Sequence, residues 1–183
     1  MIPLIGYVLM FACGALTKAT DQIADRKLKA KWQKAGYVTA AAYGAIAGFL
    51  VANSAELATL ILAITAGVLF AGKIDSKQHQ LGIAIIAAVV AIAGLPAVNI
   101  ALFAFFATLC FLDEALNGLM DKAKEKGKNI NEATRRFLNA RLLLEIGTLA
   151  FGLWSGNFGY FIALFLFDIA YNIAGRAMRA KPA

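Results

Sequence analysis

The sequence predicts an all-α fold, namely a polytopic membrane helix bundle with about seven transmembrane helices. Of its 183 residues, 61% are hydrophobic and only 16% are charged. An average soluble domain has about 45–50% apolar and about 25% charged residues. The apolar residues also form separate stretches, and every lysine and arginine lies in alternate connections between them. These three observations exclude a water-soluble single domain.

The apolar stretches give the predicted helices in chain order. The first begins at Ile2 without a basic leader and without a clear small-x-small cleavage site, so we expect a retained helix and not a removed signal peptide. Several stretches are shorter than the roughly 20 residues of a straight span, and interfacial residues or bilayer thinning would cover the difference. The predicted spans are Ile2–Thr20, Gly36–Ala52, Leu57–Gly72, Leu81–Leu95, Ala97–Leu112, Leu138–Trp154 and Phe158–Gly175.

Small residues within these spans favour close packing of helices in lipid. The second span contains Gly44 and Gly48, and the fourth contains Ala84, Ala87 and Ala88. Helices in a bilayer associate through van der Waals fit, which small side chains permit. The turns before the third, fifth and seventh spans carry no lysine or arginine, and these turns are Asn53-Ser54-Ala55-Glu56, Gly94-Leu95-Pro96 and Ser155-Gly156-Asn157.

The 18 basic residues fall in four segments. Residues 18–35 hold six of them, 73–80 two, 113–141 seven and 176–183 three. With seven spans all four segments lie on one side, as the positive-inside rule requires. We therefore predict an N-outside, C-inside topology for a single integral membrane domain over residues 1–183, in the plasma membrane of a prokaryote with its functional face towards the cytoplasm. The net charge of +7 then needs no polyanionic partner.

Acidic and amide side chains concentrate at the inner ends of the odd-numbered spans. Carboxylates at membrane depth are costly unless they are paired, hydrated or bound to a metal. A spacing of four residues places side chains on one helix face, so two of these groups form columns of oxygen ligands, which suit Mg²⁺. The groups are Asp21 and Asp25, then Asp75, then Asp113, Asn117 and Asp121, and finally Asp168 and Asn172.

These columns resemble the two aspartate-rich motifs of the UbiA-type intramembrane prenyltransferases. The first motif corresponds to Thr20-Asp21-Gln22-Ile23-Ala24-Asp25-Arg26-Lys27, and the second to the stretch from Asp113 to Asp121. Four predicted spans separate the two motifs, as in that family. The resemblance implies a transferase that moves an isoprenyl chain from a Mg²⁺-bound isoprenyl diphosphate to a lipophilic acceptor.

The resemblance also implies a role for individual residues. The metal ligands would be Asp21, Asp25, Asp113, Asn117 and Asp121. The diphosphate would be bound by Lys73, Lys77 and Arg26, because the family often places basic residues in the corresponding inner loop. Asp75, Asp168 and Asn172 are further candidates for the same layer.

Three alternatives stay open. The acids can simply be solvated partners of neighbouring lysines, as Asp25 is next to Arg26. A small transporter or cation channel would use Asp168, Glu145 and the inner acidic layer. A non-catalytic membrane partner would use the basic stretch from Asp121 to Lys128 to bind anionic lipid or a soluble protein.

Other residues carry weaker predictions. His79, the only histidine, is expected to be a hydrated loop residue. Cys13 and Cys110 lie in apolar runs and match neither a zinc site nor a disulfide framework. Nucleic acid is not an expected partner, because the aromatic residues lie within spans and are not interleaved with the basic loops.

Overall fold

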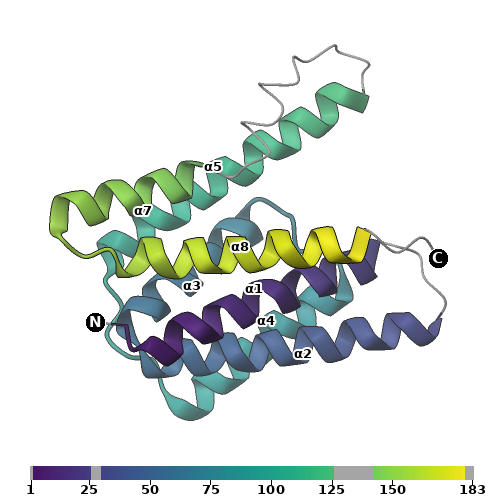
Figure 1. Ribbon diagram of the computed structural model, residues 1–183, viewed down its shortest axis with the longest axis horizontal. Coiled ribbons are helices and arrows are strands. Elements are labelled where there is room, and N and C mark those ends of the chain that lie inside the picture. The colour runs from purple at the N-terminus through teal and green to yellow at the C-terminus, as the bar shows by residue number, and fades with distance from the viewer. Residues whose placement is uncertain (1, 26–29, 126–141, 180–183) are drawn as a thin grey trace.

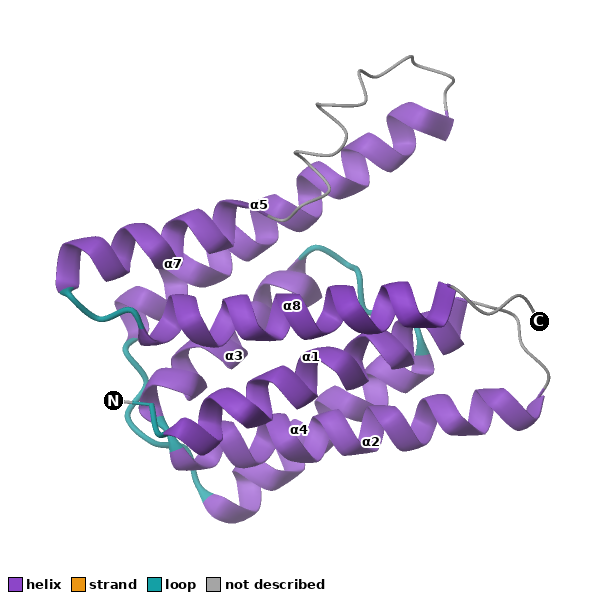
Figure 2. Cartoon of the chain, viewed as in Figure 1, coloured by secondary structure: helices purple, strands orange, loops and turns teal. Residues whose placement is uncertain are grey.

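The computed structural model describes residues 2–25, 30–125 and 142–179, and all regular structure in these ranges is helical (Figures 1 and 2). The predicted all-α fold is confirmed. The helices are α1 (Leu4–Asp25), α2 (Ala30–Asn53), α3 (Ala55–Phe70), α4 (Lys77–Ala93), α5 (Ile100–Glu125), α7 (Leu142–Ser155) and α8 (Gly159–Arg179).

Each predicted apolar stretch corresponds to one of these helices, but several helices are longer than the stretch. The first continues past Thr20 to Asp25, and the fifth continues past Leu112 to Glu125. Hydropathy marks only the apolar part of a helix, whereas backbone hydrogen bonding continues into polar residues that favour helix equally well. The predicted boundaries were therefore wrong at the charged ends.

Among the described residues, four helices are long and apolar enough to cross a membrane, within Leu4–Asp25, Gln33–Asn53, Ile100–Met120 and Gly159–Met178. The apolar helices α3, α4 and α7 are shorter, with 16, 17 and 14 residues. Large apolar side chains point outward, as in Ile92 with 88% of its surface exposed and Trp154 with 84%. Such a surface is typical of a protein that contacts lipid.

Helix contacts close a ring in the order α1, α2, α3, α5, α7 and α8, with α8 packed back against α1. The remaining described helix, α4, packs outside the ring against α2, and α3 also touches α8 across it. In this ring α1 and α5 occupy opposite positions. Figure 1 shows the C-terminal part of α5 directed away from the other helices.

The two ends of the bundle differ in charge. At one end lie the last turns of α1, α5 and α8 and the start of α2, and the α3–α4 loop opens on the same side (Figure 1). We call this the basic end, because its described basic residues include Lys18, Lys73 and Arg176.

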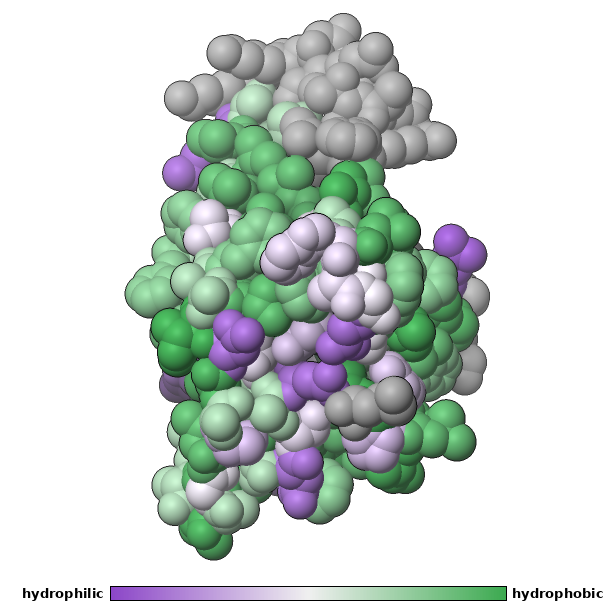
Figure 3. All heavy atoms as spheres, turned by 90° about the vertical axis from the view of Figure 1, so that its left-hand side faces the viewer, coloured by the Kyte–Doolittle hydropathy of each residue, from purple (hydrophilic) through white to green (hydrophobic). Residues whose placement is uncertain are grey.

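The opposite end, the turn end, holds the α2–α3, α4–α5 and α7–α8 connections. Polar side chains cap its helices: Ser54 accepts from the Leu57 amide at 3.2 Å, and Asn99 accepts from the Leu102 amide at 3.1 Å. Figure 3 shows hydrophilic side chains near the middle of this end, with apolar side chains around them. The polar groups at this end therefore cap the helices at the turns, and the sides of the helices stay apolar.

Glycines allow two close helix crossings. A Cβ added at Gly14 of α1 would lie 2.1 Å from the backbone oxygen of Phe167 in α8. In the crossing of α2 and α4, a Cβ at Gly44 would lie 2.6 Å from the backbone oxygen of Gly82. Nearer the turn end, the buried ring of Phe106 lies 5.2 Å from that of Tyr160 and joins α5 to α8. Close approach therefore joins α1 to α8 and α2 to α4, and an aromatic contact joins α5 to α8.

Candidate functional site

At the last turns of α1, side chains of α1, α2, α4 and α8 form a connected polar set. We call it the Asp21 network, and its members are Lys18, Asp21, Tyr43, His79 and Tyr171. The Asp21 Oδ1 atom lies 2.6 Å from His79 Nε2. Its other oxygen, Oδ2, accepts a hydrogen bond from the Tyr171 hydroxyl and lies 3.7 Å from Lys18 Nζ. Both carboxylate oxygens are therefore engaged by protein groups.

His79 continues the network from α1 to α2. Its Nδ1 atom lies 3.0 Å from the Tyr43 hydroxyl, while Nε2 faces Asp21. The backbone at His79 is fixed because Ser76 caps α4 and accepts a hydrogen bond from the His79 amide at 3.2 Å. The sequence prediction of a hydrated loop residue missed this position. The signal that could have found it is Ser76, a helix-capping residue that starts α4 one turn before the apolar stretch.

Lys18 and Tyr171 complete the network on the α8 side. Lys18 Nζ donates to the Tyr171 hydroxyl at 3.1 Å and lies 4.3 Å from the centre of its ring. Close packing leaves these groups little freedom: a Cβ on Gly175 would lie 3.1 Å from Lys18 Cε, and one on Gly82 would lie 2.1 Å from the Tyr43 hydroxyl. The network thus links α1, α2, α4 and α8 through one ammonium group, one carboxylate, one imidazole and two phenols in a connected series of hydrogen bonds.

Of the first predicted metal column, Asp25 is exposed one turn beyond Asp21. Arg26, predicted to bind diphosphate, lies outside the described residues. Because both oxygens of Asp21 already have protein partners, Asp25 is the carboxylate of this column that is open to an added ligand.

In the second predicted column, Asp113 is buried and caps another helix. Its Oδ1 accepts from the Leu143 amide at 3.1 Å and its Oδ2 from the Leu144 amide at 2.9 Å, at the start of α7. A carboxylate is favoured there because the first amides of a helix have no partner within the helix. Asn117 is half-buried one turn later, and the side chain of Asp121 lies outside the described residues.

The α3–α4 loop brings a predicted diphosphate ligand to the second column. Lys73 is exposed, and its Nζ would lie 3.6 Å from a Cβ on Gly118, the residue after Asn117. Lys77 is exposed at the start of α4, two residues before His79, and Asp75 is exposed in the loop between the two lysines. The loop therefore runs from α5 to the Asp21 network.

The side chains available as metal ligands decide whether Mg²⁺ fits at the basic end. Among the residues that the structure describes, no group of three His, Cys, Asp or Glu side chains lies close enough to hold a metal ion. Mg²⁺ does not need such a cage, since it usually keeps several waters and takes one or two carboxylates together with substrate phosphates. Asp25, exposed at the end of α1, can supply one such carboxylate, whereas the oxygens of Asp21 and Asp113 already accept hydrogen bonds from protein groups.

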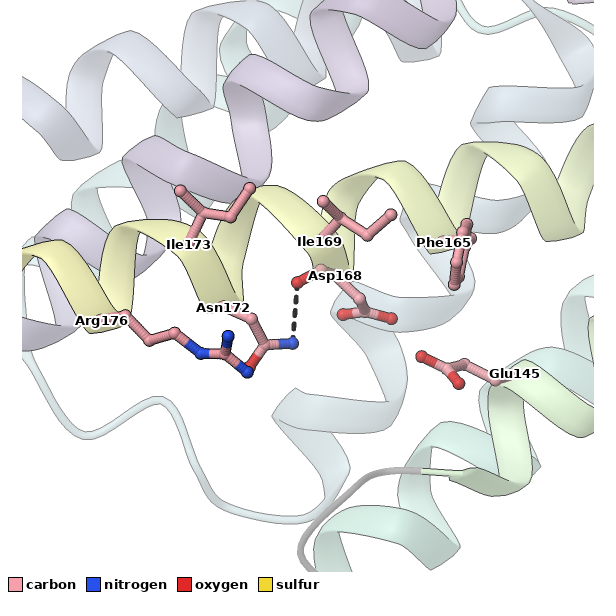
Figure 4. A pocket seen from close by; sticks show the side chains of 7 residues that line it. All are labelled: Glu145, Phe165, Asp168, Ile169, Asn172, Ile173 and Arg176. Carbon is pink, nitrogen blue, oxygen red and sulfur yellow. Dashed lines mark hydrogen bonds between the residues drawn. The ribbon is translucent and has the colours of Figure 1, made fainter.

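Asp168 and Asn172, the remaining candidates, lie apart from these columns in a groove between α7 and α8 (Figure 4). Asn172 donates from Nδ2 to the backbone oxygen of Asp168 at 2.9 Å. Figure 4 shows the carboxylates of Asp168 and Glu145 pointing towards one another from the two helices. The groove has a volume of about 380 Å³ and is lined by Glu145, Phe165, Asp168, Ile169, Asn172, Ile173 and Arg176.

Comparisons with protein-family models, with curated proteins and with solved structures find no match for this chain.

Proposed function

We propose that the protein is a membrane-embedded transferase of the UbiA type, which moves an isoprenyl chain from a Mg²⁺-bound isoprenyl diphosphate to a lipophilic acceptor at the inner membrane face. One observation carries the proposal. The helices with the two acidic columns, α1 and α5, occupy opposite positions in the ring and both end at the basic end. Lys73, in the α3–α4 loop, lies next to Gly118 of α5.

The proposed topology has seven spans, with the N-terminus outside and the C-terminus inside. The basic end then faces the cytoplasm of a prokaryotic cell, in agreement with the positive-inside rule. The shorter helices α3, α4 and α7 would cross with the help of interfacial residues or a locally thinner bilayer. Trp154, 84% exposed at the end of α7, suits the outer interface.

In this proposal the residues of the two columns have different roles. Asp25 and Asn117, with Asp121, hold Mg²⁺, which would neutralise the charge of the departing diphosphate. Lys73 and Lys77 bind the diphosphate oxygens from the α3–α4 loop. Asp21 holds the end of α1 through the network, and Asp113 holds the start of α7, so both position the helices that carry the ligands.

Ligand-dependent stability in detergent tests the proposal. Geranylgeranyl diphosphate is expected to raise the melting temperature only when Mg²⁺ is present, because binding to the folded state alone stabilises it. Asp25→Asn should abolish the shift. Glu56→Gln, which removes a carboxylate at the turn end, is the matched control and should retain it. A shift that is independent of Mg²⁺, or absent with isoprenyl diphosphates of every length, would count against the transferase.

The second candidate function is a small transporter with a cation path. It is favoured by the groove between α7 and α8, where Glu145 and Asp168 face one another (Figure 4). Ion flux into liposomes that is lost in Asp168→Asn would support it, and unchanged flux in that variant would remove Asp168 from the path.

A further inference from the structure

The face that α5 buries in the protein continues past the end of its apolar stretch. Phe106, Cys110 and Asp113 follow one another at helical spacing and are 0%, 6% and 4% exposed. Residues three and four apart lie on one side of a helix, so Asp113 belongs to the same buried side as the two apolar residues before it. Its carboxylate accepts hydrogen bonds from the Leu143 and Leu144 amides and therefore points towards α7.

The outward face of α5 continues past the same point. Phe105, Leu112 and Leu119 are spaced by seven residues, about two turns, and therefore lie on one side of the helix. They are 45%, 41% and 63% exposed. In this part of α5, which Figure 1 shows directed away from the other helices, leucine thus points outward while the preceding aspartate points inward. A helix in water has the opposite arrangement, whereas a helix in lipid turns its polar side chains towards the protein.

The length of α5 also favours a longer membrane span than hydropathy predicted. The hydrocarbon core of a bilayer is about 30 Å thick. α5 begins at Ile100, which is 71% exposed near the turn end. At about 1.5 Å per residue, the helix covers only about 18 Å from Ile100 to Leu112 but about 29 Å from Ile100 to Leu119. Charged residues ended the predicted span at Leu112, whereas the thickness of the membrane favours an end near Leu119.

Two basic residues indicate where the membrane ends. Lys122, three residues after Leu119, is exposed. The ammonium group of Lys73 would lie 3.6 Å from a Cβ on Gly118, the residue before Leu119. Lysine side chains place their charge in water while their stems lie along apolar surface. Both lysines are therefore consistent with an aqueous boundary at the turn of α5 that contains Leu119.

From these observations we infer that the lipid-facing surface of α5 extends to Leu119 and is covered by acyl chains of the leaflet at the basic end. The exposed face is continuous from Phe105, inside the span, so the lipid that contacts Phe105 is also the occupant at Leu119. Asp113 is six residues before Leu119, about 9 Å further along the helix towards the membrane centre. A carboxylate at this depth is costly unless it has partners, which the first amides of α7 supply.

Electron paramagnetic resonance of single nitroxide labels in nanodiscs tests the inference. The labels are attached to cysteines in a background without Cys13 and Cys110, both of which are buried. Oxygen concentrates among acyl chains, whereas a nickel chelate stays in water. At Leu119→Cys we expect oxygen to relax the label more strongly than the nickel chelate does, as at Phe105→Cys. Asp75→Cys, exposed in the loop at the same end, should show the reverse order.

Two results would overturn the inference. If the nickel chelate relaxes the label at Leu119→Cys as strongly as that at Asp75→Cys, this part of α5 lies in water. If neither reagent reaches the label, a protein segment or a second copy of the chain covers this face. The test uses none of the proposed Mg²⁺ ligands, so its outcome is independent of the transferase.

A second measurement avoids the spin label. In a background with Trp32→Phe and Trp154→Phe, the fluorescence of Leu119→Trp should fall when the nanodisc lipids carry brominated acyl chains. Because Leu119 is exposed, its replacement removes little packing within the protein. Fluorescence that brominated chains leave unchanged would contradict lipid contact at this position.

Discussion

The Asp21 carboxylate, near the end of α1, is stabilised by contacts with His79, Tyr171 and Lys18. A buried or half-buried carboxylate is costly unless hydrogen bonds and charges compensate it. Here each oxygen has at least one partner, and two of the three partners come from other helices. The network therefore fixes the relative positions of α1, α4 and α8 at the basic end.

Replacement of His79 tests how much the network stabilises the fold. His79→Ala leaves Asp21 Oδ1 and the Tyr43 hydroxyl without their bridging partner, so the free energy of unfolding should fall by about 1–3 kcal/mol. Reversible unfolding in mixed micelles measures this value. Lys77→Ala, an exposed position in the same helical turn, should change stability little. Equal stability of the two variants would show that the network contributes nothing.

The network also marks a limit of sequence-based prediction. Asp21 was identified as a candidate from its spacing to Asp25, because spacing within one helix can be read directly from the chain. Its partners lie 58 and 150 residues away and depend on which helices pack together. Helical periodicity contains no information on such pairs, so His79, Tyr43 and Tyr171 were not predicted as members of a site.

At the level of helices, α5 and α7 are joined by a cap and not only by apolar packing. At the start of α7, the Leu143 and Leu144 amides donate hydrogen bonds to the two carboxylate oxygens of Asp113. The two helices also pack against each other. The sequence predicted the presence of both helices, because long apolar stretches are a strong signal, but it did not predict that α5 continues to Glu125. It could not distinguish a capping aspartate from a metal ligand, since both are carboxylates at the same helical spacing.

Loss of this cap should weaken α7. Asp113→Ala is expected to lower the free energy of unfolding by about 0.5–2 kcal/mol, the usual effect of removing a helix cap. Hydrogen exchange at the Leu143 and Leu144 amides should also become faster. Thr108→Ala in the same helix serves as a control, because Thr108 is exposed and its hydroxyl donates to the backbone oxygen of Ala104 one turn earlier. Unchanged exchange at both amides in Asp113→Ala would contradict the capping role.

The crossing of α1 and α8 should tolerate no side chain at Gly14. Gly14→Ala would place Cβ 2.1 Å from the Phe167 backbone oxygen, which cannot move without moving the helix. We expect a net loss of stability of about 1–3 kcal/mol from overpacking, although alanine favours helix by about 1 kcal/mol over glycine. Gly118→Ala, whose Cβ meets only Lys73 at 3.6 Å, should be neutral or stabilising. Similar melting temperatures for both alanine variants would refute the close crossing.

For the whole molecule, the separation of charge between the two ends is the organising feature. The net charge of +7 looks like a bulk property, but Lys18, Lys73 and Arg176, which the structure describes, lie at the basic end. The sequence predicts one basic side for the whole chain, because the alternation of basic and uncharged connections requires only the order of the spans. The angle at which α5 leaves the bundle was not predictable, because it depends on packing between helices.

The topology is testable by labelling single cysteines. In a background without Cys13 and Cys110, both of which are buried, Ser155→Cys should react with an impermeant thiol reagent added to intact cells. Asp75→Cys should react only after the membrane is opened. Ser155 and Asp75 are both exposed, so accessibility within the protein is matched. Labelling of both cysteines from the same side would contradict a path in which α4, α5 and α7 each cross the membrane between the two positions.

The most direct test of the proposed transferase is equilibrium binding of geranylgeranyl diphosphate to the chain in nanodiscs, measured with and without Mg²⁺. We expect saturable binding in the presence of Mg²⁺, loss of binding when Mg²⁺ is chelated, and at least tenfold weaker binding in Asp25→Asn. No saturable binding, or the same affinity with and without Mg²⁺, would contradict the proposal.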